Sequence, residues 1–288
     1  MMANLKEIRN RIASVSSTMQ ITSAMKMVSA AKLKKAQEAI TMMRPYSSTL
    51  KQLIQNLSSS LNGDSQNPYY QVRSKKSILL VSITSNRGLC GAFNTNIIKK
   101  TKQLAGEDHK DKKVSLMTIG KKGSEILSKT GKVVSSHDNL FDNLNYNDVG
   151  KIAQLVMDNF EEKIYDEVVL IYNRFKNAAT QIVQVEPFLP IIPTEETKTS
   201  SNTDYIFEPS QAEIVNELLP KSLKIQLFKA LRDSFASEHG ARMTAMHKAT
   251  DNATDLRDQL KLTYNKARQA AITNEILEIV GGAEALNN

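Results

Sequence analysis

The residues that could most readily bind a ligand or react lie in two glycine-containing stretches, SNRGLCGAFN (85–94) and GKKGSE (120–125). The first follows an apolar run, the order found in a βα unit that binds a dinucleotide. Its glycines, Gly88 and Gly91, do not form GxGxxG, and no acid follows at the distance of a ribose contact. The second stretch has Gly, Lys and Ser without the spacing of a P-loop. Both are weak signals for phosphate binding, and the glycines more simply allow a tight turn between strand and helix.

Other groups that could react or bind a metal are few. Cys90 is the one cysteine, which excludes an intramolecular disulfide and a cysteine zinc cluster. We expect it to be a small packed side chain, with the alternative that an exposed position beside Arg87 lowers its pKa. The histidines have no ligand spacing; they are His109, His137, His239 and His247. The sequence therefore predicts no catalytic residue, no cofactor and no metal site.

The segment at residues 75–208 alternates short β-branched runs with helical patterns, which is typical of an α/β domain with a largely parallel sheet. Polar residues and prolines make 191–204 a loop. The expected strands are SILLVSIT (77–84), VSLMTIG (114–120), DEVVLIYNRF (166–175) and TQIVQVEPF (180–188), and the expected helices span 93–104 and 149–163.

Residues 1–61 form a single helical pattern in which steps of three and four residues connect one seam. At 1.5 Å per residue the helix would be about 80 Å long, with Pro45 as a possible kink. The seam runs through Leu5, Ile8, Ile12, Val15, Met19, Thr22, Lys26, Ser29, Leu33, Ala36, Ile40, Met43, Leu50, Ile54 and Leu57.

A second long helical pattern occupies residues 209–288. Ser210 and Glu213 fit a capping box, and Pro220 suits the first turn of a further, longer helix, which we expect Gly281-Gly282 to end. Small residues dominate its seam, so a partner helix can approach closely. This seam runs through Met246, Ala249, Ala253, Leu256, Leu260, Thr263, Ala267 and Ala270.

Neither seam can be buried by its own helix, and a seven-residue repeat is typical of a coiled coil. The α/β domain between the two segments lets the chain return beside itself. We therefore predict a long antiparallel coiled coil of the N- and C-terminal helices, flanking the α/β domain. The alternative is that both helices pack on the sheet as an ordinary bundle.

The first seam becomes polar at Thr22, Lys26 and Ser29 while keeping its register. Residues 1–60 hold nine Lys and Arg against two Asp and Glu, so most of the net charge of +8 belongs to this helix. We interpret the polar interval as a surface for an acidic partner, with a solvated charged face as the alternative. A basic nucleic-acid-binding or scaffold protein is a further alternative, although Tyr46 is the only aromatic residue of the helix that could stack on a base.

Four stretches resemble the gamma subunit family of the F-type ATP synthase, the central stalk of its F1 sector. The stretches lie in family order and reach from one end of the chain to the other. They are IRNRIASVSSTMQITSAMKMVSAAKLKKAQ (8–37), TSNRGLCGAFN (84–94), EHGARMTAMHKATDNATDL (238–256) and YNKARQAAITNEILEIVGGAEAL (264–286).

The resemblance implies an antiparallel terminal coiled coil beside a Rossmann-like domain that is not an enzyme, with catalysis on beta. It implies three alpha and three beta subunits, the epsilon subunit and the membrane c-ring as partners, at the cytoplasmic face of a bacterial inner membrane. By motif match, an acidic loop of beta would meet Met25, Lys26, Lys32 and Lys35, with Arg87 and Cys90 nearby. A catch loop of beta would meet Arg268 and Gln269, and the positions that influence coupling are Arg242, Thr273 and Glu275. The rival function is a nucleotide-binding α/β enzyme.

Overall fold

The structure is a computed structural model that describes residues 5–60, 67–191 and 211–287. The chain divides into two compact units, one of Met1–Ser29 with Met243–Asn288 and one of Ala30–Arg242. Two long helices, α1 (Leu5–Ser60) and α5 (Gln211–Asn287), contribute to both units. The sequence predicted three domains, at residues 1–61, 75–208 and 209–288. The two compact units divide the chain elsewhere, within α1 and within α5, so the three-domain division stays a prediction.

The larger unit contains a five-stranded sheet in the order β3-β2-β1-β4-β5. The neighbours β3, β2, β1 and β4 are parallel, and β5 is antiparallel to β4. The strands are β1 (Ser77–Ile83), β2 (Lys113–Ile119), β3 (Val133–His137), β4 (Glu167–Phe175) and β5 (Gln181–Leu189). The predicted largely parallel sheet and its four strands are confirmed. The strand β3 was missed, because VVSSH at this edge is short and half polar.

Helical segments connect the parallel strands. They are α2 (Phe93–Gln103), a π-helical turn (Leu104–Asp108), α3 (Lys121–Leu127) and α4 (Tyr146–Glu161), with short 3₁₀ turns at Pro68–Tyr70 and Asn139–Phe141. Side chains alternate across β1, so Leu79 and Val81 pack with α4 while Ile78 and Leu80 pack with α2 and α3. The sheet is therefore covered on both faces, as its near-continuous apolar strands require.

Parts of α1 and α5 complete the core on the α4 side of the sheet. Leu50 and Ile54 of α1 share one buried cluster with Leu219, Leu223 and Leu227 of α5. The alternative of helices packed on the sheet is thus partly realised: within the larger unit the two helices pack against each other and against the sheet at once.

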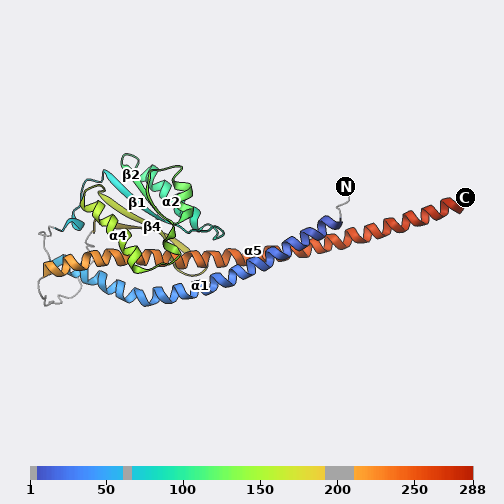
Figure 1. Cartoon of the computed structure of the whole chain (residues 1–288), viewed down its shortest axis with the longest axis horizontal. Helices are drawn as coiled ribbons and strands as arrows, with labels where there is room; N and C mark the ends of the chain where they lie inside the picture. Colours follow the sequence, from blue (N-terminus) through green and yellow to red (C-terminus); the bar gives the residue numbers. More distant parts are fainter. Residues whose placement is uncertain (1–4, 61–66, 192–210, 288) are drawn as a thin grey trace. The chain divides into compact units, whose positions relative to one another are not determined.

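In the smaller unit the two helices pair with each other in opposite directions. Thr250 donates a hydrogen bond to Thr22 at 2.9 Å, and Nη1 of Arg257 lies 3.4 Å from Sδ of Met19. Increasing numbers in α5 therefore meet decreasing numbers in α1, and Ala253 is buried here. The predicted antiparallel pairing of the terminal helices is confirmed (Figure 1).

The ends predicted for the last helix are wrong. One helix runs from Gln211 to Asn287, with Pro220 inside it and with Gly281 and Gly282 in its final turns. The helix continues through Pro220 because burying the neighbouring Leu219 and Leu223 stabilises it more than the low helix propensity of proline destabilises it. Two glycines weaken a helix without obliging it to stop. Ser210 of the expected capping box and the expected loop from residue 192 onward lie outside the described residues.

The polar interval of α1 does not turn away from its partner helix. Thr22 is 9% exposed and Ser29 is 2% exposed, and Lys26 is half-buried. The Thr22 hydroxyl donates to the Met19 carbonyl at 3.0 Å, and the Ser29 hydroxyl donates to the Met25 carbonyl at 2.8 Å. Thr22 and Ser29 therefore remain in the buried seam, because local hydrogen bonds let their hydroxyls be buried at little cost. The interpretation of this interval as a surface for an acidic partner stays a prediction.

Candidate partner-binding site

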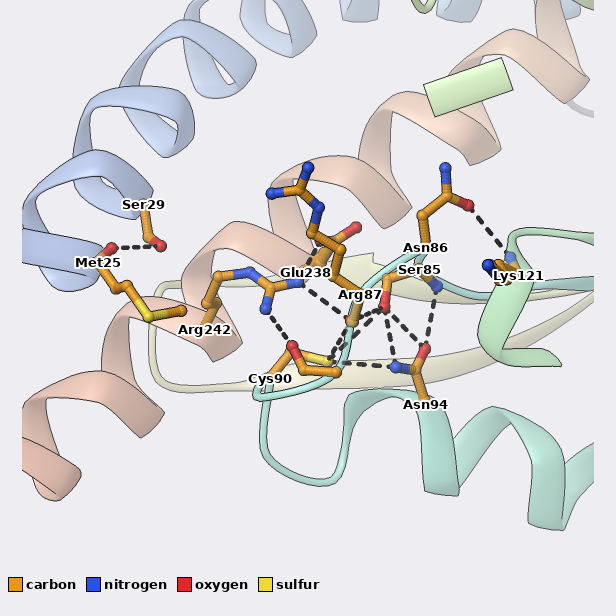
Figure 2. A network of polar contacts seen from close by, with 11 residues as sticks. Met25, Ser29, Ser85, Asn86, Arg87, Cys90, Asn94, Lys121, Glu238 and Arg242 are labelled. Atoms are coloured by element: carbon orange, nitrogen blue, oxygen red, sulfur yellow. Dashed lines mark hydrogen bonds and ion pairs between the residues drawn. The ribbon is translucent and has the colours of Figure 1, made fainter. Parts of the chain in front are cut away.

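The turn after β1 is held together by its own polar side chains (Figure 2). The Ser85 backbone N–H donates to Oδ1 of Asn94 at 2.9 Å, and the Ser85 hydroxyl donates to the carbonyl of Arg87 at 2.7 Å. Nδ2 of Asn94 donates back to the Ser85 hydroxyl at 2.8 Å and lies 3.3 Å from Sγ of Cys90. These bonds fix the backbone between the end of β1 and the start of α2.

An ion pair on α5 fastens the same turn to the helix. Nη2 of Arg242 lies 2.5 Å from Oε1 of Glu238, one helical turn earlier, and the two side chains are 9% and 10% exposed. The Arg242 guanidinium also donates to the carbonyls of Gly88 and Arg87 (Figure 2). Burial raises the pKa of Glu238, while Arg242 acts in the opposite direction. One guanidinium of α5 thus donates hydrogen bonds to two successive carbonyls of the turn.

Cys90 faces inward from the turn. It is 1% exposed and packs with Phe93 and Ala241. Burial raises the pKa of its thiol, and Ser85 and Arg242 only reduce the shift. The alternative that Cys90 is an exposed thiol of lowered pKa is therefore wrong, because its side chain lies under the turn while Arg87 lies on the surface.

The carboxyl ends of β1 and β4 mark the topological switch point, where doubly wound α/β proteins bind their ligands. Here α5 packs against this end of the sheet. The Ser237 hydroxyl donates to the Asn173 carbonyl of β4 at 2.9 Å. A Cβ on Gly240 would stand 3.2 Å from the carbonyl oxygen of Ala178, so the helix approaches the β4–β5 turn as closely as a glycine allows. The C-terminal helix α5 thus packs against the β4 side of this end of the sheet.

The predicted site residues fall into exposed and buried groups. On the larger unit Lys32, Lys35 and Arg87 are exposed, whereas Cys90 and Arg242 are buried. The structure brings Arg87 and Arg242 together, since the Arg242 guanidinium donates to the Arg87 carbonyl. Burial raises the pKa of Glu238, and the positive charges of Arg242, Lys32 and Arg87 act in the opposite direction.

The other predicted residues lie on the smaller unit. Met25 and Lys26 of α1 are half-buried. Near the C-terminal end of α5 the side chains are exposed, and the Thr273 hydroxyl donates to the Gln269 carbonyl at 3.0 Å. This exposed group consists of Arg268, Gln269, Thr273 and Glu275.

Sequence reasoning named Arg242 but did not foresee that the polar stretch DSFASEHGAR (233–242) of α5 is buried on nearly every side. Among the described residues, Oδ1 of Asp233, the Ser234 hydroxyl and both ring nitrogens of His239 are buried without a hydrogen-bond partner. The His239 ring instead meets the Phe235 ring edge-on, with centroids 4.5 Å apart. The signal in the sequence is the spacing of small residues through 233–242, which lets neighbouring elements pack closely against several faces of the helix.

The described part of the chain contains no helix that is long and apolar enough to cross a membrane. Its architecture defines a class of protein: a Rossmann-like domain with its own C-terminal helix packed against the sheet, joined to a long antiparallel helix pair.

Comparison with known proteins identifies the family. The ATP synthase family model matches residues 4–286. The ATP synthase gamma chain of Flavobacterium psychrophilum is 66% identical over 285 residues, covering 99% of both chains, and that of Christiangramia forsetii is 62% identical, covering 99% of this chain and 100% of the other. The chain belongs to the ATP synthase gamma chain family. The resemblance seen in four stretches of sequence is thereby confirmed.

Solved structures agree with this assignment. A chain from the central stalk and c-ring structure of the Tetrahymena thermophila mitochondrial ATP synthase is 31% identical, with a TM-score of 0.64, covering 80% of this chain and 99% of that one. A chain from the Euglena gracilis mitochondrial ATP synthase is 23% identical, with a TM-score of 0.72, covering 98% of this chain and 94% of that one. At this identity the second likeness concerns the fold, which confirms the predicted fold class.

Proposed function

We propose that the chain is the central rotor shaft of an F1Fo ATP synthase, coupling ion-driven rotation of the c-ring to conformational change in the catalytic beta subunits. Its partners are three alpha and three beta subunits, the epsilon subunit and the c-ring. It carries no catalytic site of its own and works at the cytoplasmic face of a bacterial inner membrane. The observation that supports this proposal most is the whole-length family match, at 66% identity, to ATP synthase gamma chains.

The antiparallel helix pair suits a shaft mechanically. Two helices paired over many turns resist bending better than one, and the contacts between Thr22 and Thr250 and between Met19 and Arg257 fix their register. The surface around such a pair differs from side to side. Three chemically identical beta subunits around it would therefore meet three different surfaces, which would hold their sites at different nucleotide affinities.

The size of the task requires many contacts. Shifting one beta site from 1:99 to 99:1 between two conformations takes about 5.5 kcal/mol of differential binding. One exposed ion pair contributes about 0 to 1 kcal/mol. Lys26, Lys32 and Lys35 are therefore proposed to share the contact with an acidic loop of beta, each contributing a small part.

The buried members of the predicted set are given a different role. Arg242 and Cys90 lie beneath the surface, so we assign them to holding the turn that carries Arg87 toward beta. Met25 is proposed to contact the same acidic loop. The exposed group near the C-terminal end of α5 is proposed to meet the catch loop of beta and to influence coupling; it consists of Arg268, Gln269, Thr273 and Glu275.

The rival function, a nucleotide-binding enzyme, requires an open switch point. Ser237 and Gly240 of α5 pack there against the sheet and its turn, which favours the shaft over the enzyme. Equilibrium binding of ATP and NAD to the purified chain separates the two, since a shaft binds neither. A nucleic-acid-binding protein would instead bind duplex DNA with strong salt dependence.

The decisive experiment mixes the chain with cognate alpha and beta subunits. One copy should join a six-subunit ring and stimulate ATP hydrolysis, and failure of both results would refute the shaft. Lys26→Ala should leave hydrolysis by the assembled complex largely intact, because one half-buried lysine supplies only a small share of the coupling energy. Near-total loss of activity in that variant would contradict the distributed contact.

A further inference from the structure

Leu89 is an apolar side chain on an exposed turn, held in an unfavourable backbone conformation. It is 66% exposed, and its φ is +63°, in the left-handed region that L-residues with a Cβ avoid. Glycine would adopt this conformation freely, and Gly88 and Gly91 flank the position. Leucine at this position therefore costs more conformational free energy than glycine would. The chain gains little in return from its own core, because most of the Leu89 side chain is exposed.

The backbone on both sides of Leu89 is fixed. Before it, the carbonyls of Arg87 and Gly88 accept hydrogen bonds from Arg242, which Glu238 holds (Figure 2). After it, Cys90 is 1% exposed under the turn. With the preceding carbonyl bound to α5 and the following side chain buried, the Leu89 side chain is presented outward from a rigid support.

The charged side chain next to Leu89 in the turn is that of Arg87, which is exposed. Burial raises the pKa of Glu238, whose carboxylate is paired with Arg242, and the positive charges of Lys32 and Arg87 act in the opposite direction. The backbone N–H of the exposed Lys121 donates to Oδ1 of Asn86, next to Arg87, at 3.1 Å. A surface that complements this turn is apolar at its centre and acidic at its edge.

We propose that Leu89 is a partner-binding residue that inserts into an apolar pocket bordered by carboxylates on the beta subunit, and that Arg242 is the residue that positions it. The conformational cost at Leu89 is then part of a preformed binding surface, since strained residues persist where the surrounding structure holds them for a function. This inference rests on the proposed function and names one contact of that same surface.

The test uses two glycine substitutions whose effects on stability should be alike. Lys163, after α4, is the other non-glycine residue with positive φ in the described chain, at +61°, and it is exposed. Leu89→Gly and Lys163→Gly each relieve left-handed strain, so each should raise the midpoint of thermal unfolding of the chain by roughly 1–3 °C. Only Leu89→Gly should weaken assembly.

Assembly is measured with purified alpha and beta subunits, as the concentration of chain that gives half-maximal stimulation of ATP hydrolysis. Leu89→Gly should raise that concentration about tenfold or more, because a buried leucine is lost from the interface. Leu89→Met keeps an apolar side chain and should stay within about threefold of the unaltered chain. Lys163→Gly should match the unaltered chain.

A gain in thermal stability together with a loss of assembly is a combination that a purely structural role of Leu89 does not produce. If Leu89→Gly assembles as well as Lys163→Gly, the inference is overturned while the proposed function stands. If Leu89→Gly lowers thermal stability, the residue supports the fold and the inference is also overturned. If the unaltered chain itself does not assemble, the proposed function fails and this inference fails with it.

Discussion

His239 offers the sharpest test of the buried polar stretch of α5. The side chain is 6% exposed, packs against the ring of Phe235 and lies near two cations, Lys32 and Arg242. Burial is the main cause that lowers the pKa of His239 to about 4, and the two cations add to the effect. The neighbouring Glu238 shifts in the opposite direction, with its pKa raised by burial.

The sign of the pH dependence follows from proton binding. Between pH 6.5 and pH 4 the unfolded chain binds a proton at His239 and the folded chain does not. Stability from this residue is therefore complete above about pH 6.5 and is lost as the pH falls toward 4. With an unfolded pKa of about 6.5 and a folded pKa of about 4, the loss between pH 7 and pH 5 is about 2 kcal/mol.

The perturbation is His239→Gln, which removes the titration. The chain has no tryptophan and eight tyrosines, so tyrosine fluorescence can follow urea unfolding at pH 7 and pH 5. The advantage of the unaltered chain over the variant should shrink by about 2 kcal/mol at the lower pH. Asp233 and Glu238 titrate in both proteins, so subtracting one from the other largely removes their opposite effect.

A matched control is His247→Gln. His247 is exposed, with an ion pair to Asp251 at 3.3 Å, and such surface pairs contribute little to stability. Its pH dependence should follow that of the unaltered chain within about 0.5 kcal/mol. If His239→Gln and His247→Gln respond alike to pH, the reasoning about a buried, neutral His239 is refuted.

Three further substitutions or reactions test other parts of the structure. Gly120→Ala should lower the free energy of unfolding by about 2 kcal/mol or more, which chemical unfolding measures. The reason is that Gly120 has φ +103° and that an added Cβ would stand 2.2 Å from the Thr84 carbonyl oxygen. Thr250→Val should cost about 1 kcal/mol by removing its hydrogen bond to Thr22, and the double valine variant should cost less than the sum of the two single variants in a mutant cycle. Cys90 should react with a thiol reagent at least about tenfold more slowly in the native chain than in urea at pH 8, because its thiol is buried and its pKa is raised.

The results that would contradict these three expectations are equally specific. Gly106→Ala serves as the control for Gly120, since an added Cβ there meets no atom within 4 Å; equal stabilities of the two variants would contradict the close approach to Thr84. Strict additivity of the two valine substitutions would mean that the hydroxyls of Thr22 and Thr250 do not interact. Native and unfolded chains that react at the same rate would place Cys90 at the surface.

The sequence predicted the periodic parts of the fold because the period is a property of neighbouring residues. The steps of three and four that begin at Leu5 identified the face of α1 that is buried, and Ile8, Leu33 and Ile40 are 7%, 5% and 3% exposed. The second seam was correct at Met246 and Ala253, but Leu256 is 41% exposed. Spacing gives the stripe of a helix only approximately, since 3.6 residues per turn drift against a seven-residue repeat.

The candidate site was harder to predict because its geometry depends on residues that are far apart in the chain. Arg87 and Arg242 were both named from the sequence, yet only the structure brings the Arg242 guanidinium to the carbonyl of residue 87. The left-handed conformation of Leu89 likewise does not follow from the propensity of leucine, and it lies next to the carbonyls that Arg242 of α5 binds. Glu238, which completes the pair, was not named as a site residue from the sequence.

Both polar regions of the long helices follow one physical pattern. At Thr22 and Ser29 the hydroxyls bond within the helix pair, and at Glu238 and Arg242 a buried pair bonds to a turn, so each of these four polar side chains has a specific partner. Such contacts restrict how helices can slide or rotate more than apolar packing does, because a shift of one residue leaves a buried group unpaired. A shaft that transmits torque needs this restriction of register. The apolar seam supplies cohesion, and the polar contacts at defined positions keep the two helices, and the turn fastened to α5, from slipping.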